Sequence, residues 1–448
     1  MSIFLRTEQR LPQMVWGAGK VVRSHSTALT KTQQVVSAHR PWSGNISSCR
    51  YASGRALSAL AAWMDRRQAQ LKVAKTTTTP RGQVVDWVPI ESQTSGEIAS
   101  PPSDSKKTDT SDPKRASKRA RFDIGEPGPK GHVPVLRPDL STLSIAHVKS
   151  AKEGGRLVNI HRSTRREGRI DSAPPNPQGY FHATSSQTVQ AYGCEGLLNL
   201  WNPQINTPSG NGSDHSISQT WLQNYQTTKT HSVEAGLTVD KSLNGDDSAH
   251  LFIYFTTNGY GGDGDNIGGY NQLHKGWVQT HPTIFPGTGF NGISSDGSTQ
   301  HEIGIKFQLY QSNWWFGIED ADSGPSWSWL GYYPGTLFKK GLDTVAQWVS
   351  FGGEVFSALA NPCSTKDQMG SGRQAASGWT HAAYQRNLRI QTNTTTTLEE
   401  TVTLVNFNGV AGVDAAATTC TSNPYTIQTT MNNTGSWGSF QYFGGPTK

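Results

Sequence analysis

The chain has 448 residues, which is enough for two or three domains with a large buried core, so a small disulfide-held scaffold is excluded. No run of eighteen apolar residues occurs in it, which excludes a membrane-spanning helix. Only 16% of the residues are charged, while 47 are glycine and 23 are proline, and this composition is typical of many short strands and turns.

The charge is divided unevenly along the chain. From residue 171 onward, 11 Lys and Arg face 20 Asp and Glu, a net charge of −9, which leaves +16 for residues 1–170. Ten of the 14 tryptophans also lie after residue 171, so residues 171–448 are expected to form the folded domain. The N-terminal region is then either a disordered basic tail or a cationic segment that lies on this anionic domain through complementary charge. A folded domain with a net charge of −9 repels a phosphate backbone, so no nucleic-acid partner is expected.

The N-terminal region contains few elements. Residues 1–56 carry eight Lys or Arg against one acid, a composition found both in transit peptides and in mispredicted first exons. Helical spacing of apolar residues predicts an amphipathic helix over 57–73, and residues 82–90 (GQVVDWVPI) read as a strand. The stretch 92–130 is rich in Pro, Ser and Lys and is predicted to be a disordered linker.

Two basic clusters lie in this region. The first cluster consists of Lys114, Arg115, Lys118, Arg119 and Arg121. Its composition fits three alternatives: a nuclear signal, a dibasic processing site or a solvated tail. The second lies just before the composition changes, where a protease would separate the two parts of the chain, and it consists of Arg165, Arg166 and Arg169.

From about residue 178 onward the pattern is strand, turn, strand. Alternating polar and apolar residues predict antiparallel, half-buried strands. These strands are predicted at 196–201, 216–222, 231–239, 249–256, 276–280, 302–310, 314–318, 348–355, 386–392 and 400–405. One helix is predicted at 336–348. The fold class is therefore all-β, an antiparallel β-sandwich or jelly roll preceded by a partly disordered region.

The common catalytic signatures are missing from the sequence. It has no G-x-S-x-G elbow and no P-loop, and His301-Glu302 lacks the second histidine of a zinc peptidase. Asp263 and Asp265 lie in a glycine-rich loop that lacks the other ligands of a calcium site, so a hairpin loop is favoured. No metal and no cofactor is expected.

Two glutamates interrupt apolar, strand-like runs: Glu234 in HSVEAGLTVD and Glu354 in WVSFGGEVF. A glutamate on the solvent face of a strand is ordinary. The glycines that precede Glu354, however, leave room for a backbone or a ligand, as in the floor of a groove. Trp277, Trp315 and Tyr332 are candidates for the walls of such a substrate groove, although a core position is the more ordinary role for each of them in a tryptophan-rich sandwich.

Seven short motifs make residues 179–448 resemble the neprosin family of glutamic peptidases. They are LNLWNP (198–203), VEAG (233–236), GYN (269–271), NWW (313–315), GYYPGTLF (331–338), GGEV (352–355) and QMGSG (368–372). The resemblance implies that Glu234 and Glu354 are the catalytic residues. It also implies that residues 57–170, with GQVVDWVPIES at 82–92, are an activation region.

The chain also departs from the pattern of plant members. Gly269 and His274 stand where those members have a cysteine pair, and Trp87 replaces a cysteine of the activation region. These differences suit a fungal-type member, in which the proline preference associated with plant members is not assumed.

The resemblance implies an acid-active endopeptidase made as a zymogen, in which two carboxyl groups activate a water molecule. Its partners are then a protein or peptide substrate and its own N-terminal region as an intramolecular inhibitor, with the protein a monomer that binds no membrane. The alternative is a non-catalytic, lectin-like sandwich that binds glycan in an aromatic groove.

Four cysteines are present, and a disulfide between Cys363 and Cys420 is predicted in the later part of the domain. Cys194 is then a buried thiol or is paired elsewhere. Together with N-x-S/T triplets at Asn211, Asn393 and Asn432, the disulfide predicts a secreted protein. No secretory h-region is visible in residues 1–56, so the export signal is expected in a different N-terminal sequence.

Overall fold

The computed structural model describes residues 62–63, 65–103, 112, 114–142, 179–205, 214–225, 229–359, 361–394, 402–414, 420 and 423–446. All of them belong to one compact unit that spans residues 46–448. No helix in these ranges is long and apolar enough to cross a membrane.

The first sheet has seven antiparallel strands in the order β11-β10-β9-β8-β17-β6-β20. Its strands are β6 (Tyr180–Ala191), β8 (His215–Asn224), β9 (His231–Val239), β10 (His250–Thr256), β11 (Gly268–Tyr270), β17 (Ala346–Phe356) and β20 (Val410–Asp414).

The second sheet has ten strands, eight of which follow the order β12-β16-β15-β14-β7-β18-β22-β21, while β19 pairs with β18 and β3 pairs with β14. Its strands are β3 (Lys118–Arg119), β7 (Gly193–Asn199), β12 (Val278–Gln279), β14 (His301–Tyr310), β15 (Asn313–Glu319), β16 (Ser328–Tyr333), β18 (Ala383–Gln391), β19 (Leu404–Asn406), β21 (Thr426–Thr430) and β22 (Phe440–Gly444).

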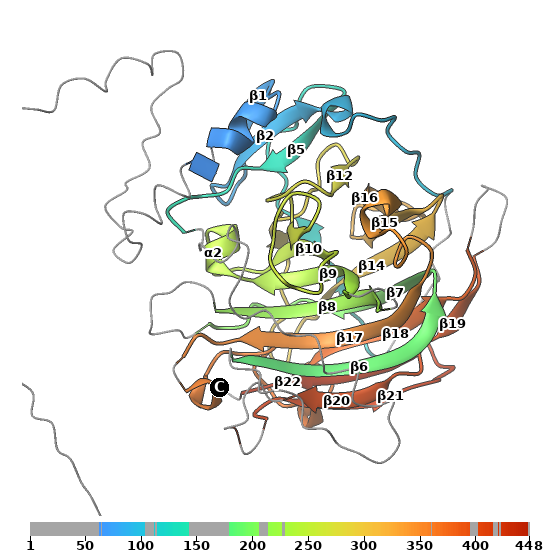
Figure 1. Cartoon of the computed structure of the whole chain (residues 1–448). Coiled ribbons are helices and arrows are strands. Elements are labelled where there is room, and N and C mark those ends of the chain that lie inside the picture. The colour runs from blue at the N-terminus through green and yellow to red at the C-terminus, as the bar shows by residue number, and fades with distance from the viewer. Residues whose placement is uncertain are drawn as a thin grey trace, which may run out of the picture. The chain divides into compact units, whose positions relative to one another are not determined.

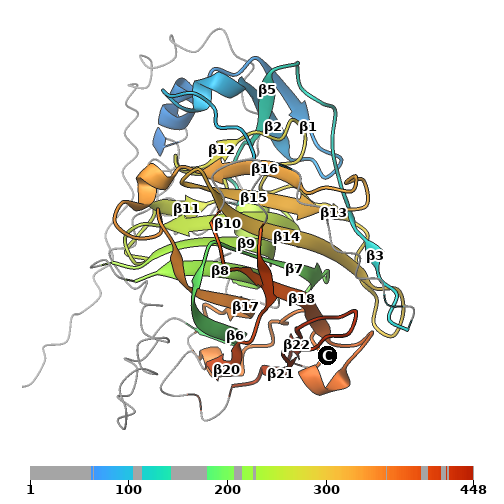
Figure 2. The same cartoon turned by 90° about the vertical axis from the view of Figure 1, so that its right-hand side faces the viewer.

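The two sheets pack against each other as a sandwich (Figure 1, Figure 2). On β9, alternate residues from Val233 to Val239 enter the core, where they join alternate residues of β14 from Ile303 to Leu309. Because neighbouring residues of a strand point to opposite faces, Glu234 of β9 lies on the face that is turned away from the core. The predicted all-β sandwich is confirmed.

The predicted helix at 336–348 is wrong. Gly335–Phe338 forms a single 3₁₀ turn (η5), and β17 already begins at Ala346. Lys340 has a φ of 65°, a left-handed conformation that ends any helix at this point. Phe338 and Leu342 are nevertheless buried in the core. Their helix-like spacing therefore comes from two short turns that each place one apolar side chain in the core. The remaining short elements are α2 (Lys241–Asn244), η2 (Ile90–Gln93), η6 (Pro362–Ser364) and η7 (Ala375–Ser377).

The N-terminal region contributes a third sheet. Residues 62–63 and 65–70 are helical, within the predicted helix, whose beginning lies outside the described residues. The sheet that follows has the order β1-β2-β5, with β1 (Lys75–Thr78), β2 (Val84–Pro89) and β5 (His132–Leu136), and β2 confirms the strand predicted at 82–90. Its residues Val85, Trp87 and Leu136 form a buried cluster with Phe285 of the sandwich.

The stretch predicted to be a disordered linker is ordered in its described second half. Lys118–Arg119 (β3) pairs in parallel with the start of β14, and β4 (Arg121–Phe122) pairs with β13 (Phe290–Asn291). Ala120 is fully buried between these strands. The composition missed this because the stability comes from strand pairing with the sandwich, which a count of apolar residues in one segment does not record.

Upstream of these strands, the same stretch covers an aromatic cluster on the second sheet. Ile98 and Ala99 pack on this cluster, and the backbone N–H of Ala99 donates to the hydroxyl of Tyr332 at 3.2 Å. The cluster consists of Val278, Tyr310, Trp315, Trp327, Trp329 and Tyr332.

The first basic cluster contacts the sandwich through ion pairs. Arg119 donates to Glu302 and to Glu319, and Arg386 donates to the same Glu302 from its Nε at 2.9 Å. Burial would raise the pKa of Glu302, but the hydrogen bonds and charges of the two arginines lower it below its ordinary value. The Glu302 carboxylate is completely buried, so it depends on these partners. A solvated tail does not describe this cluster.

We expect Arg119→Ala to lower the free energy of unfolding by about 1–3 kcal/mol, because it removes one of two guanidinium groups from a buried carboxylate. Arg121→Ala is the matched control, since Arg121 pairs with Asp322 where both side chains are more than half exposed, at 58% and 57%. Urea unfolding followed by tryptophan fluorescence measures both variants. Equal, small changes would show that the Arg119 contact contributes nothing.

Candidate functional site

One pocket of about 470 Å³ lies on the outer face of the seven-stranded sheet. Both Glu234 and Glu354 line it, together with side chains from β6, β8, β17 and the loop that carries Tyr260. Its rim includes β20, where Val410 is 79% exposed. The two predicted catalytic glutamates therefore share one pocket.

Strand β8 determines how the two glutamates are spaced. Glu234 lies opposite Trp221 of β8, and Glu354 lies opposite Ile217 from the other side. Positions 217 and 221 are an even number of residues apart, so both glutamates are on the same face. In a flat sheet this register separates their Cα atoms by about 16 Å, so the carboxyl groups approach each other only through their side chains.

Glu354 is held between two histidines. The Nε2 of His182 lies 3.0 Å from its Oε2, and the Nε2 of His215 lies 3.3 Å from its Oε1. Burial would raise the pKa of Glu354, but the hydrogen bonds and charges of the histidines lower it to about 2. Behind His215, the buried Asp240 lies 3.9 Å from Nδ1. Glu354 is therefore ionised across the acid range.

Glu234 has a different environment. Burial raises its pKa to about 7, although the hydroxyls of Ser232 and Tyr260 both donate to its Oε1, at 2.5 and 2.6 Å, and so lower it in part. The charge of Glu354 adds to the increase. Glu234 is therefore protonated in acid, where Glu354 is ionised.

The pKa values of the two carboxyl groups differ mainly because their surroundings differ. Repulsion between neighbouring carboxylates is one general cause of such a difference. In the structure the largest cause at Glu234 is burial, and at Glu354 the lowering comes from the histidines, while the repulsion between the glutamates is a smaller contribution. Each glutamate has its own set of partners, and these partners decide which one holds a proton.

Tyrosines form one wall beside the pocket. Tyr254 and Tyr260 stack with ring centroids 6.0 Å apart, and Tyr254 also contacts Tyr270 of the GYN motif. Tyr254 lies opposite Glu234 on one side and opposite Tyr270 on the other. Burial raises the pKa of Tyr270, and the charges of Glu354 and Glu234 raise it further.

The loop that lacks a cysteine pair is held by other contacts. A Cβ at Gly269 would come within 2.7 Å of the His274 ring, so these two positions touch although neither is a cysteine. The Nδ1 of His274 lies 3.7 Å from Asp265, which also accepts from the backbone N–H of Lys275 at 3.0 Å. A close-packed glycine and an ion pair take the place of the crosslink.

The aromatic residues predicted to line the groove lie elsewhere. Trp277 is buried in the core, where its ring contacts Tyr333. Trp315 and Tyr332 pack on each other in the aromatic cluster of the second sheet, beneath Ile98 and Ala99. These three do not line the glutamate pocket, whose indole rings are Trp221 and Trp348. The sequence alone does not show which tryptophans lie on the same face of the sheet as the glutamates, because this depends on which strands pair and in which register.

Sequence reasoning also missed the partners of the glutamates. Ser232 could have been found, because a residue two positions before Glu234 on a strand points to the same face. His182, His215 and Tyr260 come from separate elements, and nothing local marks them. His182 lies opposite Glu354 only through the pairing of β6 with β17.

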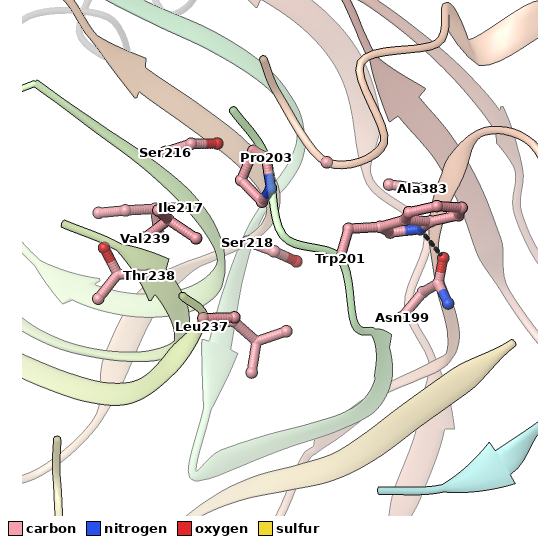
Figure 3. Close-up of a pocket in the computed structure, with 12 residues that line it drawn as sticks. Asn199, Trp201, Pro203, Ser216, Ile217, Ser218, Leu237, Thr238, Val239 and Ala383 are labelled. Atoms are coloured by element: carbon pink, nitrogen blue, oxygen red, sulfur yellow. Dashed lines mark hydrogen bonds between the residues drawn. The ribbon is translucent and has the colours of Figure 1, made fainter. Parts of the chain in front are cut away.

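A second cavity, of about 20 Å³, has room for about one water molecule (Figure 3). Trp201 lines it and donates from its indole N–H to Asn199. Pro203 and Gly370 also line it, so the LNLWNP and QMGSG motifs meet here. These two motifs have a structural role at this position, away from the glutamates.

The fold and the pocket define a class: a β-sandwich protein with a histidine-bound carboxylate and a protonated carboxyl in one pocket on the outer face of a sheet. The family model for Neprosin matches residues 212–446, which is more than half of the chain, so the chain belongs to the neprosin family. This family is associated with peptidase activity.

The predicted disulfide between Cys363 and Cys420 is confirmed, with the two Cα atoms 5.4 Å apart. Because disulfides persist in oxidising compartments, the bond and the family together indicate an extracellular protein. Cys194 is a buried free thiol whose pKa burial raises to about 12, so it is unreactive.

Carboxyl-carbon NMR of protein labelled at glutamate should show one group that titrates at about 7 and disappears in Glu234→Gln. Glu354 should stay ionised down to a pH of about 2. Replacing His215 by Asn removes a cationic partner and should raise the pKa of Glu354 by roughly one unit. Two glutamates that both titrate near their ordinary value would contradict the described environments.

Proposed function

We propose that this protein is a glutamic endopeptidase that hydrolyses peptide bonds of protein substrates. In this proposal Glu354 is the general base and Glu234 is the general acid. The observation that carries the assignment is the asymmetry of their partners: two histidines at Glu354, and burial with two hydroxyls at Glu234.

The reaction needs no covalent intermediate. The Glu354 carboxylate accepts a proton from a water molecule, whose oxygen attacks the carbonyl carbon of the peptide bond. When the tetrahedral intermediate collapses, the C–N bond breaks and Glu234 donates its proton to the leaving nitrogen. Glu354 is then protonated and Glu234 ionised, and exchange of one proton with water at each group restores the starting state.

The pH range of activity follows from the two protonation states. Activity requires ionised Glu354, so it should be lost as the pH falls through about 2. It also requires protonated Glu234, so it should be lost as the pH rises through about 7. The low pKa makes Glu354 a weak base. A base with a higher pKa would be protonated in the acid range, where Glu234 holds the proton that it donates.

Glu234→Gln and Glu354→Gln should each lower kcat by about 100- to 10,000-fold, because each removes one proton-transfer group. Cleavage of a denatured protein is measured across the pH range given above, and the wild-type profile should be bell-shaped. Asp247→Asn, which removes an exposed carboxyl that does not line the pocket, should leave the rate unchanged. Binding of a glycan without any cleavage of protein would favour the lectin alternative.

We also propose that residues 57–170 are an activation region, that the protein is secreted and that it acts as a monomer. The support for an activation region is the set of contacts that Arg81, Ile98, Arg119 and Arg121 make with the anionic sandwich. No described residue of the N-terminal region lines the glutamate pocket, so these contacts attach the region without filling the site.

Mass spectrometry of acid-treated protein should show a cut between Arg115 and Pro175, with activity rising as the intact chain disappears. The basic residues at 165, 166 and 169 are the favoured position, because the segment from 118 to 136 is bound to the sandwich by strand pairing and ion pairs. A chain that remains whole and nevertheless digests substrate would refute the zymogen.

A further inference from the structure

Hydrolysis between two glutamates leaves one requirement open. The carbonyl oxygen becomes negatively charged in the tetrahedral intermediate, and it needs a hydrogen-bond donor. Glu354 is a carboxylate and cannot donate, while the proton of Glu234 goes to the leaving nitrogen. Tyr260 donates to Glu234, and Gln223 donates to the hydroxyl of Tyr260 at 2.8 Å, so both of these polar groups are already engaged.

Gln219 occupies the position between the two glutamates. It lies on β8 halfway between Ile217 and Trp221, the residues opposite Glu354 and Glu234. Both glutamates are thus its diagonal neighbours on the same face, each about 7–8 Å away between Cα atoms. Gln219 lines the same pocket.

Glycines flank Gln219 on both sides. It lies directly opposite Gly236 of β9 and Gly352 of β17. A Cβ at Gly236 would lie 2.0 Å from the carbonyl oxygen of Ser218, and a Cβ at Gly352 would lie 2.4 Å from that of Ala183. Close backbone approach therefore requires glycine at both positions. As a result, the residues directly opposite Gln219 on both neighbouring strands have no side chain.

The Gln219 side chain lacks a partner for its oxygen. The residue is 2% exposed, and its Oε1 is buried without a hydrogen-bond partner among the described residues. Two other buried glutamines of the sandwich are bonded: Gln385 donates to Ser218 at 3.0 Å, and Gln441 donates to Gln385 at 2.8 Å. The Oε1 of Gln391 on β18 also lacks a partner in the described part of the chain, but Gln391 does not line the glutamate pocket. An unsatisfied buried polar group costs about 1–3 kcal/mol, so its presence calls for an explanation.

We propose that Gln219 is a third catalytic residue, whose carboxamide N–H donates to the carbonyl oxygen of the scissile peptide bond. The assignment rests on the proposed peptidase function. The carboxamide has a donor and an acceptor on one rotatable end, so it can present its NH₂ to the oxyanion and its oxygen to a peptide N–H of the substrate. The carboxamide neither gains nor loses a proton during the reaction. Its hydrogen bond becomes stronger as negative charge develops on the carbonyl oxygen in the transition state.

Gln219→Ala should lower kcat by about 100-fold while KM changes little, because the lost hydrogen bond is strongest in the transition state. Gln219→Glu, which replaces the donor by an oxygen at nearly constant size, should lose at least as much. Gln428→Ala, on the exposed face of β21, is the matched control and should leave kcat unchanged. Both pH limits of the wild type should persist in Gln219→Ala, since glutamine does not titrate.

Thermal unfolding separates this role from a structural one. Removing an unsatisfied polar group should leave the Tm of Gln219→Ala unchanged or raise it, whereas a glutamine that held the strands together would lower it. A kcat within twofold of the wild type, or a loss seen in KM alone, would overturn the assignment while the peptidase function stands. A wild-type protein that cleaves nothing after activation would overturn both.

Discussion

The pocket depends on the register of a single strand. Glu234 and Glu354 are separated by 120 positions in the chain, yet each lies on a strand that pairs with β8, one from either side. A shift of one residue in either pairing would turn a carboxyl group into the core, among Val233, Val349 and Phe351. Burying an unpaired carboxylate there costs free energy, so the apolar core residues of these strands determine the register. The register in turn determines where the two carboxyl groups lie in the pocket.

The same arrangement explains how one kind of side chain can have two roles. The hydrogen-bond partners of Glu354 on β6 and β8 are histidines, whereas those of Glu234 among the described residues are the hydroxyl groups of Ser232 and Tyr260. Strand pairing selects these neighbours from distant parts of the chain. The pocket thus resembles sites in which environment separates the pKa values of two carboxyl groups, but here both histidines are hydrogen-bonded to one member only.

Much of the fold could be predicted from local sequence, because half-buried strands alternate. The strand at 231–239 has the predicted limits, and the confirmed disulfide also came from the sequence. Strand β6 was missed because its run of Ser, Thr and Gln carries little alternation. The glutamates were found through the resemblance to the neprosin family. Their histidine partners, Gln219 and the true pocket tryptophans depend on which strands are neighbours, and no local pattern contains that information.

The attachment of the N-terminal region has a consequence for the chain if the proposed cut is made. Ile98 and Ala99 shield a group of indole and phenol rings, and Arg119 supplies a second cation to a fully buried carboxylate. A cut in the backbone breaks neither contact, so the severed piece can stay attached as a separate light chain. If it does leave, the rings around Trp315 and Tyr332 face water. Maturation then changes surface hydrophobicity, and the cleaved protein will be retained longer than its precursor on a hydrophobic column.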